Sequence, residues 1–374
     1  MRCLIPPATD VLVVGGGPAG LAAAIAARRQ GLEVTVADHA VPPVNKACGE
    51  GIMPDGLAAA LDLGIRIDES LGHRFRGIRF CEGGLAVDAP FPAGPGLGIR
   101  RTVLHRVLIE HAAALGVHFA WGSRVRLIDW ETVAVNGSVV RARWIIGADG
   151  GQSRVRNWAK LEATTRSSLR FGFRRHCRMA PWGEHMEIHW SPNGQLYITP
   201  TAAEELCVVL ISRDPHDRLE TALPQFPEAA ARLAGATWVG GERGGASVTR
   251  RLRSVYRNNV ALIGDASGSV DAITGEGLCL LFQQAAAMGT ALAAGDLALY
   301  QREHRRIGRR PAVMSDFMLL LDGAGRNCLR ARVLRAFAAQ PELFRRMLEM
   351  HVGRWTPAAF AANSLALGWR MLRG

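Results

Sequence analysis

The sequence lacks several features that would assign it to particular protein classes. Its seven cysteines form no C-x-x-C pair, which argues against a zinc ribbon or a disulfide framework and suits a reducing cytoplasm. Aromatic residues are only 6% of 374 residues and no nucleic-acid-binding motif occurs, so we expect no nucleic-acid partner. Every apolar run of about 18 residues is interrupted by charge or frequent glycine, so we expect no membrane-spanning helix. No metal site is predicted.

Lysine is rare, and the positive charge is concentrated in one region. Only Lys46 and Lys160 are lysines, so nearly all of the 45 basic residues are arginine. Residues 301–374 contain 14 arginines and 5 acidic residues, a local charge of +9 out of the total of +12. Such a region is either a solvated helical face or a surface for a membrane or an acidic partner. We expect a cytoplasmic protein with possible peripheral membrane contact through this region.

Strands and helices alternate at both ends of the sequence. A β-branched run at residues 10–15, an alanine-rich segment at 18–29 and a second run at 33–38 predict a strand, a helix and a strand. A further strand at 259–264 and a long helix at about 276–294 follow a strand-rich block at residues 168–212. The pattern predicts an α/β fold with a doubly wound, Rossmann-like domain and an inserted β-rich domain.

We divide the chain into three predicted parts. The cofactor-binding domain is discontinuous, the substrate domain is inserted into it, and the end of the chain is helical. The cofactor-binding domain comprises residues 1–75, 98–160 and 256–300, the substrate domain residues 76–97 and 161–255, and the helical C-terminal region residues 301–374.

A glycine fingerprint, Gly15-x-Gly17-x-x-Gly20, lies between the first predicted strand and helix. The first glycine allows a tight turn, the second lets a diphosphate approach the backbone, and the third lets the helix pack on the strand. The helix N-terminus offers free N–H groups to that diphosphate. Asp38 ends the second strand, where a carboxylate can accept hydrogen bonds from ribose hydroxyls. This arrangement predicts a dinucleotide site.

Two later segments distinguish FAD from NAD. Residues 147–156 read Gly-Ala-Asp-Gly-Gly-Gln-Ser-Arg-Val-Arg, and residues 264–268 read Gly-Asp-Ala-Ser-Gly, followed by Ile-Thr-Gly-Glu-Gly-Leu at 273–278. With these three motifs the sequence resembles the FAD-dependent oxidoreductases that include the aromatic-hydroxylase and geranylgeranyl-reductase types. The resemblance implies noncovalently bound FAD and covers most of the chain.

The resemblance also implies site residues. Asp265 would accept hydrogen bonds from the ribityl hydroxyls, and the helix opening at residues 275–277 would direct its N-terminus at the flavin pyrimidine edge. Arg156 would belong to the second motif near the cofactor. Arg101 resembles an arginine near the FAD phosphates, although a surface arginine at a helix start fits equally well. The predicted FAD-binding set is Gly15, Gly17, Ala19, Gly20, Asp38, Lys46, Cys48, Gly49, Arg101, Val125, Asp149, Gly150, Gly264, Asp265, Gly275, Glu276, Gly277 and Leu278.

A second loop is expected to lie beside the reactive ring of the flavin. Residues 45–52, Asn-Lys-Ala-Cys-Gly-Glu-Gly-Ile, are similar to the K-x-C-G-x-G segment of the geranylgeranyl-reductase type, which lies beside the isoalloxazine. Cys48 is therefore either a contact at the flavin or a small buried residue that fills a tight turn. Cys48 and Tyr197 are the candidate catalytic residues, as proton donors. His176, His189 and neighbouring residues of the strand-rich block are more simply explained as core or surface.

Two enzyme functions and one non-enzyme function remain open. A Gly-Gly-Glu-Arg-Gly-Gly segment at 240–245 has no strand–turn–helix frame and is predicted as a loop, so we expect no separate NAD(P)-binding domain. NAD(P)H would then be a transient reductant, or a protein donor would supply the electrons. The sequence narrowly favours an NAD(P)H-using monooxygenase that hydroxylates a hydrophobic aromatic or polyketide-like small molecule. The alternative is a flavin-dependent C=C reductase of a prenyl or polyene substrate. A pocket with purely structural FAD is the non-enzyme alternative.

Overall fold

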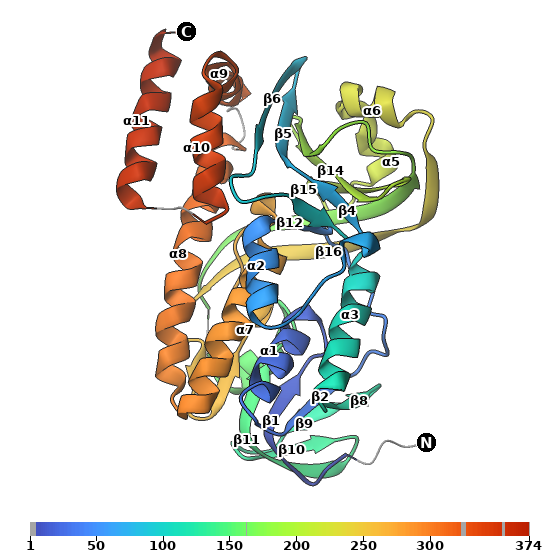
Figure 1. The fold of residues 1–374 in the computed structure, drawn as a ribbon, viewed down its shortest axis with the longest axis vertical. Coiled ribbons are helices and arrows are strands. Elements are labelled where there is room, and N and C mark those ends of the chain that lie inside the picture. The colour runs from blue at the N-terminus through green and yellow to red at the C-terminus, as the bar shows by residue number, and fades with distance from the viewer. Residues whose placement is uncertain (1–4, 162, 323–326, 354–355, 374) are drawn as a thin grey trace.

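The computed structural model describes residues 5–161, 163–322, 327–353 and 356–373. It confirms the predicted fold class: an α/β layer with a Rossmann-like sheet, a second strand-rich sheet, and a helical C-terminus (Figure 1). The division into residue-numbered domains stays a prediction.

The first sheet has eight strands and carries the predicted cofactor motifs at one edge. Its path is β17-β18-β11-β1-β2-β8, with β10 paired to β11 and β9 to β10. β1 pairs in parallel with β2 and β11, so the carboxyl ends of these strands meet at the edge where ligands bind in such sheets. The strands are β1 (Ala8–Val14), β2 (Val34–Asp38), β8 (His118–Trp121), β9 (Val125–Leu127), β10 (Thr132–Val135), β11 (Ser138–Gly147), β17 (Tyr256–Arg257) and β18 (Val260–Leu262).

Helices cover one face of this sheet. α1 (Pro18–Arg28) packs against α3 (Arg101–Ala114) and α7 (Gly277–Ala294). α1 is nearly all buried because its alanines and glycine allow close approach on both sides. Among the described residues, α7 is the one helix long and apolar enough to cross a membrane, but most of it is buried against α1, α2 (Pro54–Asp62) and α8 (Leu297–Leu321). We therefore interpret α7 as a core helix.

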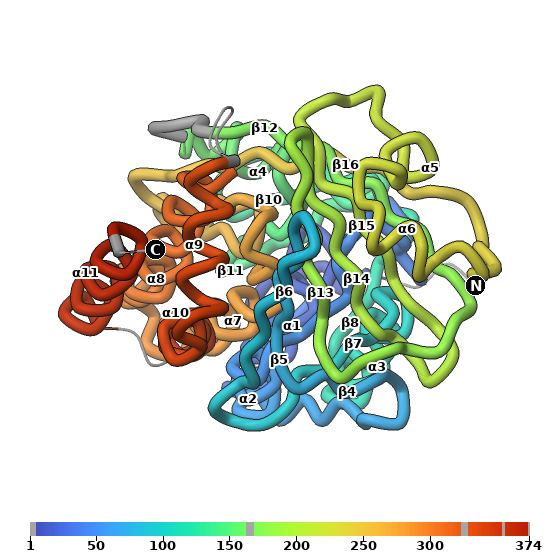
Figure 2. Tube along the Cα trace, turned by 90° about the horizontal axis from the view of Figure 1, so that it is seen from above, coloured from blue at the N-terminus to red at the C-terminus, as the bar shows by residue number. Residues whose placement is uncertain are grey.

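The second sheet has seven strands in the order β16-β12-β15-β14-β13-β5-β6. Alternate residues face opposite sides: Leu196 and Leu210 pack towards α5 (Leu219–Ala222) and α6 (Pro227–Leu233), whereas Tyr197 and Val209 belong to the main core (Figure 2). The strands are β5 (Gly77–Glu82), β6 (Leu85–Pro90), β12 (Ala163–Arg178), β13 (His185–Trp190), β14 (Gly194–Ala202), β15 (Glu205–Ser212) and β16 (Thr237–Leu252).

The prediction of a loop at residues 240–245 was wrong, because this segment lies within β16. β16 is the edge strand and pairs antiparallel with β12, with Gly244 opposite Phe173 and Gly245 opposite Gly172. Long-range backbone pairing thus overrides the local preference of glycine for turns.

The remaining elements join the two sheets and extend the C-terminus. A three-stranded sheet is formed by β3 (Gly51–Ile52), β7 (Gly96–Gly98) and β4 (His73–Phe75). The predicted loop at residues 45–52 therefore ends in strand β3. The other helices are α4 (Arg154–Trp158), α8, α9 (Asn327–Ala339), α10 (Pro341–His351) and α11 (Pro357–Arg373), with short 3₁₀ turns at Glu69–Leu71, Leu223–Gln225, Gly264–Ser267 and Ala272–Thr274.

Candidate functional site

The glycine fingerprint forms a tight turn with open space at its centre. Gly15 has φ +110°, and an added Cβ there would lie 2.4 Å from the Ala148 carbonyl oxygen. An added Cβ at Gly20 would lie 1.9 Å from the Gly15 carbonyl oxygen. A Cβ added at Gly17, by contrast, would meet no heavy atom within 4 Å. The outer glycines therefore serve the packing of the protein, whereas Gly17 borders space at the N-terminus of α1, where a diphosphate fits.

The side chains of Asp38 and His105 form hydrogen bonds to the backbone of this turn. Asp38, at the end of β2, accepts hydrogen bonds from the amides of Gly16 (2.6 Å) and Ala40 (2.8 Å). Buried His105 on α3 accepts from the Val44 amide at Nδ1 (3.2 Å), so its Nε2 donates to the Gly16 carbonyl (2.7 Å). Burial lowers the pKa of His105, which agrees with a neutral ring. His105 was not predicted from the sequence, because nothing distinguishes it from other residues of an amphipathic helix.

The third motif lies directly beside the glycine turn. Gly264 has φ +60°, and an added Cβ would lie 2.7 Å from the Ala19 Cβ, so both positions need small residues. Asp265 is solvent-exposed, yet desolvation by surrounding protein raises the pKa of its carboxyl. An exposed group that is also desolvated lines a recess. The positive charges of Arg101 and Lys46 oppose this rise and therefore lie close to the same recess.

Arg101 fits a ligand in that recess better than a surface role. It begins α3, and its Nε is buried without a hydrogen-bond partner among the described residues. Buried polar atoms in proteins are rarely left without a partner, and Nε of Arg101 is available to donate to a bound group. Open space at Gly17, helix N–H groups and nearby cations fit the diphosphate of FAD, and Asp265 fits its hydroxyl groups.

The second motif positions loops around the recess. Asp149 accepts from the amides of Arg154 (2.7 Å) and Val155 (3.2 Å), which caps the start of α4. Gly150 follows in the left-handed region, with φ +83°. Buried Arg156 donates to the carbonyls of Ala266 (3.1 Å) and Gly151 (2.8 Å), so it joins the second motif to the third. Val125 lies apart from these loops, at the start of β9, where it pairs with Val135.

The loop at residues 45–50 is fixed on the face of the second sheet. Cys48 is half-buried; its Sγ accepts from the Glu50 amide (3.4 Å), and the Cys207 thiol donates to the Cys48 carbonyl (3.6 Å). Arg174 donates to the Asn45 side-chain oxygen. Lys46 and Gly49 are exposed. The contacts to Cys207 and Arg174 come from strands more than 120 residues away in sequence.

Glu50 is the centre of this attachment, and its role was not predicted from the sequence. It is buried, and its backbone adopts φ +59°, which is rare for a residue with a side chain. One carboxylate oxygen lies 2.6 Å from His176 Nε2, and the other accepts from the Arg101 amide at 3.1 Å. Arg174 lies 3.6 Å away. The available signal was an acid between two loop glycines, together with Arg174 and His176 on one face of a predicted strand.

Tyr197 and Glu276 both support the loop that precedes α7. The Tyr197 hydroxyl is buried, its pKa is raised by burial, and it donates to the Ile273 carbonyl at 2.7 Å. The Glu276 carboxylate is also buried and lies 3.3 Å from Arg310 of α8, and burial raises its pKa to about 8 against the opposing charge of that arginine. Its side chain therefore contacts the helical region, while its backbone opens α7.

The glycines around Glu276 shape the start of this helix. Gly275 has φ +66° and Gly277 begins α7, while Leu278 is buried in the core. The N-terminus of an 18-residue helix carries a partial positive charge that stabilises negative charge near it.

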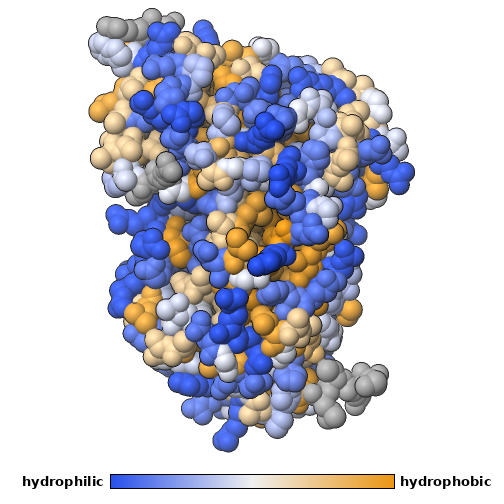
Figure 3. All heavy atoms as spheres, viewed as in Figure 1, coloured by the Kyte–Doolittle hydropathy of each residue, from blue (hydrophilic) through white to orange (hydrophobic). Residues whose placement is uncertain are grey.

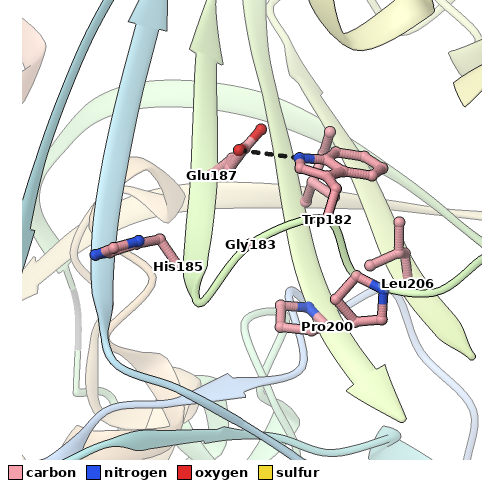
Figure 4. Close-up of a pocket in the computed structure, with 8 residues that line it drawn as sticks. Trp182, Gly183, His185, Glu187, Pro200 and Leu206 are labelled. Carbon is pink, nitrogen blue, oxygen red and sulfur yellow. Dashed lines mark hydrogen bonds between the residues drawn. The ribbon is translucent and has the colours of Figure 1, made fainter. Parts of the chain in front are cut away.

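A small hollow on the opposite face of the second sheet has a different character. It measures about 10 Å³, is lined by Trp182, His185, Glu187 and Pro200 among others, and is shown in Figure 4. Such a volume holds at most one water molecule, so it offers no room for an organic substrate. On the face viewed in Figure 3, apolar side chains gather at mid-height, over the region between α2 and α3.

Fold and site together define a flavoprotein of the doubly wound dinucleotide-binding class. A family model described as FAD binding domain matches residues 8–296. The chain belongs to this FAD-binding family and is an FAD-dependent oxidoreductase, which confirms the resemblance seen in the motifs and its expected cofactor.

Proteins with different activities are similar to this chain in sequence. Menaquinone reductase of Mycolicibacterium smegmatis is 30% identical over 302 residues, 72% of each chain. Digeranylgeranylglycerophospholipid reductase 2 of Methanopyrus kandleri is 29% identical over 72% of this chain and 73% of that protein. Rifampicin monooxygenase of Rhodococcus hoagii is 34% identical, but over 42% of this chain and 34% of its own length. A flavoprotein/dehydrogenase from Cytophaga hutchinsonii, 18% identical, shares the fold with a TM-score of 0.82 over 98% of this chain and 100% of that chain.

Proposed function

We propose that the protein is a flavin-dependent reductase of carbon–carbon double bonds in a hydrophobic prenyl or polyene substrate. The observation that carries the proposal is the loop at residues 45–50, in which Cys48 lies two residues after Lys46, a cation whose charge acts on the Asp265 carboxyl. The two reductases described above match over most of the chain, and their names pair reduction with lipids that bear isoprenoid chains. This reverses the narrow preference drawn from sequence motifs alone.

The chain's own residues can supply the proton for such a reduction. Bound FAD, once reduced, supplies a hydride; transient NAD(P)H would be its electron source. Cys48 accepts a hydrogen bond at sulfur from the Glu50 amide, and this bond does not use the thiol proton. The Tyr197 proton is already engaged with the Ile273 carbonyl. We therefore favour Cys48 over Tyr197 as the general acid.

The second candidate is hydroxylation by a monooxygenase. It is supported by the identity with rifampicin monooxygenase, which spans 170 residues. That stretch is less than half of the chain, so it bears more on cofactor binding than on the substrate. Both candidates need reduced flavin and differ in what accepts electrons from it.

Anaerobic turnover separates the two candidates. FAD-loaded protein is reduced chemically and mixed with a geranylgeranyl lipid, either without air or in the presence of labelled oxygen. The mass of the product is then measured by mass spectrometry. We expect a gain of two hydrogens per reduced double bond, formed equally well without air. A product that contains labelled oxygen and forms only in air would overturn the reductase proposal in favour of hydroxylation.

A matched pair of variants tests the proton donor. Cys48→Ala is expected to slow reduction about a hundredfold while FAD stays bound, because the proton source is removed. Cys328→Ala, at an exposed cysteine of α9, is the control and is expected to keep wild-type rates. Equal rates in both variants would exclude Cys48 as the donor.

A further inference from the structure

The last helix, α11, has apolar side chains on two sides. Towards the protein, Leu367 is buried and Asn363 donates to the Leu343 carbonyl of α10 at 3.1 Å. Towards solvent, Leu365, Trp369 and Leu372 are 75%, 58% and 83% exposed. Their spacing of four and three residues places them on one side of the helix. We call these three residues the outer α11 face.

The outer α11 face differs from ordinary exposed hydrophobic residues. Single exposed leucines are common on protein surfaces and need no explanation, whereas a row of large apolar groups marks a contact surface. α11 packs on α9 and α10 and lies at the outer edge of the molecule, with the second sheet beyond α9 and α10 (Figures 1 and 2). A surface presented at such an edge can meet a large flat partner without obstruction from the rest of the fold.

The charge of the surrounding helices identifies the partner. Residues 301–374 carry 14 arginines against 5 acidic residues. The two helices on which α11 packs carry exposed arginines: Arg332 and Arg335 on α9, and Arg345 and Arg346 on α10. The two on α10 pair with Glu342, and Arg345 also pairs with Glu349, so the local excess of positive charge comes from the arginines of α9. An exposed leucine–tryptophan face in a basic region is the combination that binds the headgroup region of anionic bilayers.

We propose that the outer α11 face inserts into the headgroup region of an anionic lipid membrane, with the neighbouring arginines directed to lipid phosphates. Tryptophan suits this depth, because its ring is apolar and its N–H is polar. The proposal does not depend on which reaction the flavin site catalyses. It assigns membrane contact to three named side chains, which the basic charge alone does not do.

Vesicle flotation of the FAD-loaded full chain tests the proposal. The probes are vesicles of phosphatidylcholine alone and vesicles that also contain phosphatidylglycerol. The wild type is expected to float with the anionic vesicles, more weakly with the neutral ones, and less at high salt. Replacing Leu365, Trp369 and Leu372 together by serine is expected to lower partitioning at least about tenfold. The control, Leu61→Ser with Val139→Ser, removes apolar side chains of similar exposure (57% and 56%) elsewhere and is expected to bind as the wild type.

Three results would overturn the proposal. The first is equal flotation of the triple variant and the wild type, and the second is equal binding of the wild type to neutral and anionic vesicles. The third is a wild-type dimer that the triple variant dissociates without any vesicle binding, which would assign the face to a second copy of the chain. Leu372→Ser alone, at the most exposed position, repeats the test with the least effect on folding.

Discussion

The glycine turn at the start of α1 and the loop at residues 45–50 border the same recess but are held in different ways. The turn depends on backbone packing among near neighbours, as the 1.9 Å clash at Gly20 demonstrates. The loop depends on three contacts between residues more than 120 positions apart: Glu50 with His176, Cys48 with Cys207, and Asn45 with Arg174. Local spacing can encode the first kind of site, whereas the second exists only once the two sheets have come together.

Gly17→Val is expected to have the largest effect of these variants. It should abolish FAD binding at the turn while the turn keeps its backbone conformation. Gly17 has an extended backbone (φ −72°, ψ 178°) that valine adopts readily, and its Cβ direction is open. The side chain would occupy the space of the diphosphate, so FAD affinity should fall at least about a thousandfold. Gly183→Val, also open at Cβ, is the control. Full FAD content in folded Gly17→Val protein would refute the assignment of the turn.

Glu50→Gln is expected to weaken the contacts that hold the loop at residues 45–50 on the second sheet. The change keeps the size of the side chain but leaves Arg174 and His176 buried without their carboxylate. Stability should fall by about 3 kcal/mol, since removal of one member of a buried ion pair is strongly destabilising. Urea unfolding measures the loss. Glu184→Gln, in an exposed pair with Arg76, should change stability by less than about 1 kcal/mol. Similar losses in both variants would contradict the comparison.

The same contrast explains what the sequence could predict. The spacing of Gly15, Gly17 and Gly20 predicted the turn, because each glycine acts within a few residues of itself. The strand at 240–245 was missed, since its order comes from pairing with β12 rather than from its own composition. Glu50 and His105 were missed for a related reason: a buried polar residue is recognised by partners that lie far away in sequence.

Asp265→Ala tests FAD binding where the glycine turn and the loop at residues 45–50 come together. The carboxylate lies near Lys46 of the loop and follows Gly264, which packs on Ala19 of α1. Loss of this charged acceptor should weaken FAD binding by about 1.5–3 kcal/mol, as a charged hydrogen bond contributes. Titration of the apoprotein with FAD measures the change. Asp214→Ala, at a turn that follows β15 of the second sheet, is the control. An unchanged FAD affinity in Asp265→Ala would show that residues 264–265 form a turn that does not bind FAD.

His304→Gln probes the support behind the Gly264–Ser267 turn and should have the smallest effect. Nε2 of His304 lies 2.9 Å from Ser267 Oγ, and burial lowers the pKa of His304 from 6.5 to about 4. The unfolded chain therefore binds a proton below pH 6.5 that the folded protein does not, and stability falls as pH drops from 6.5 towards 4. Between pH 7 and 5.5 the loss should be about 1 kcal/mol. In His304→Gln, denaturant unfolding at both pH values should show a loss smaller by that amount. His216→Gln, in the loop after β15, should keep the wild-type dependence. An unchanged pH dependence in His304→Gln would mean that the pKa of His304 is not lowered in the folded protein.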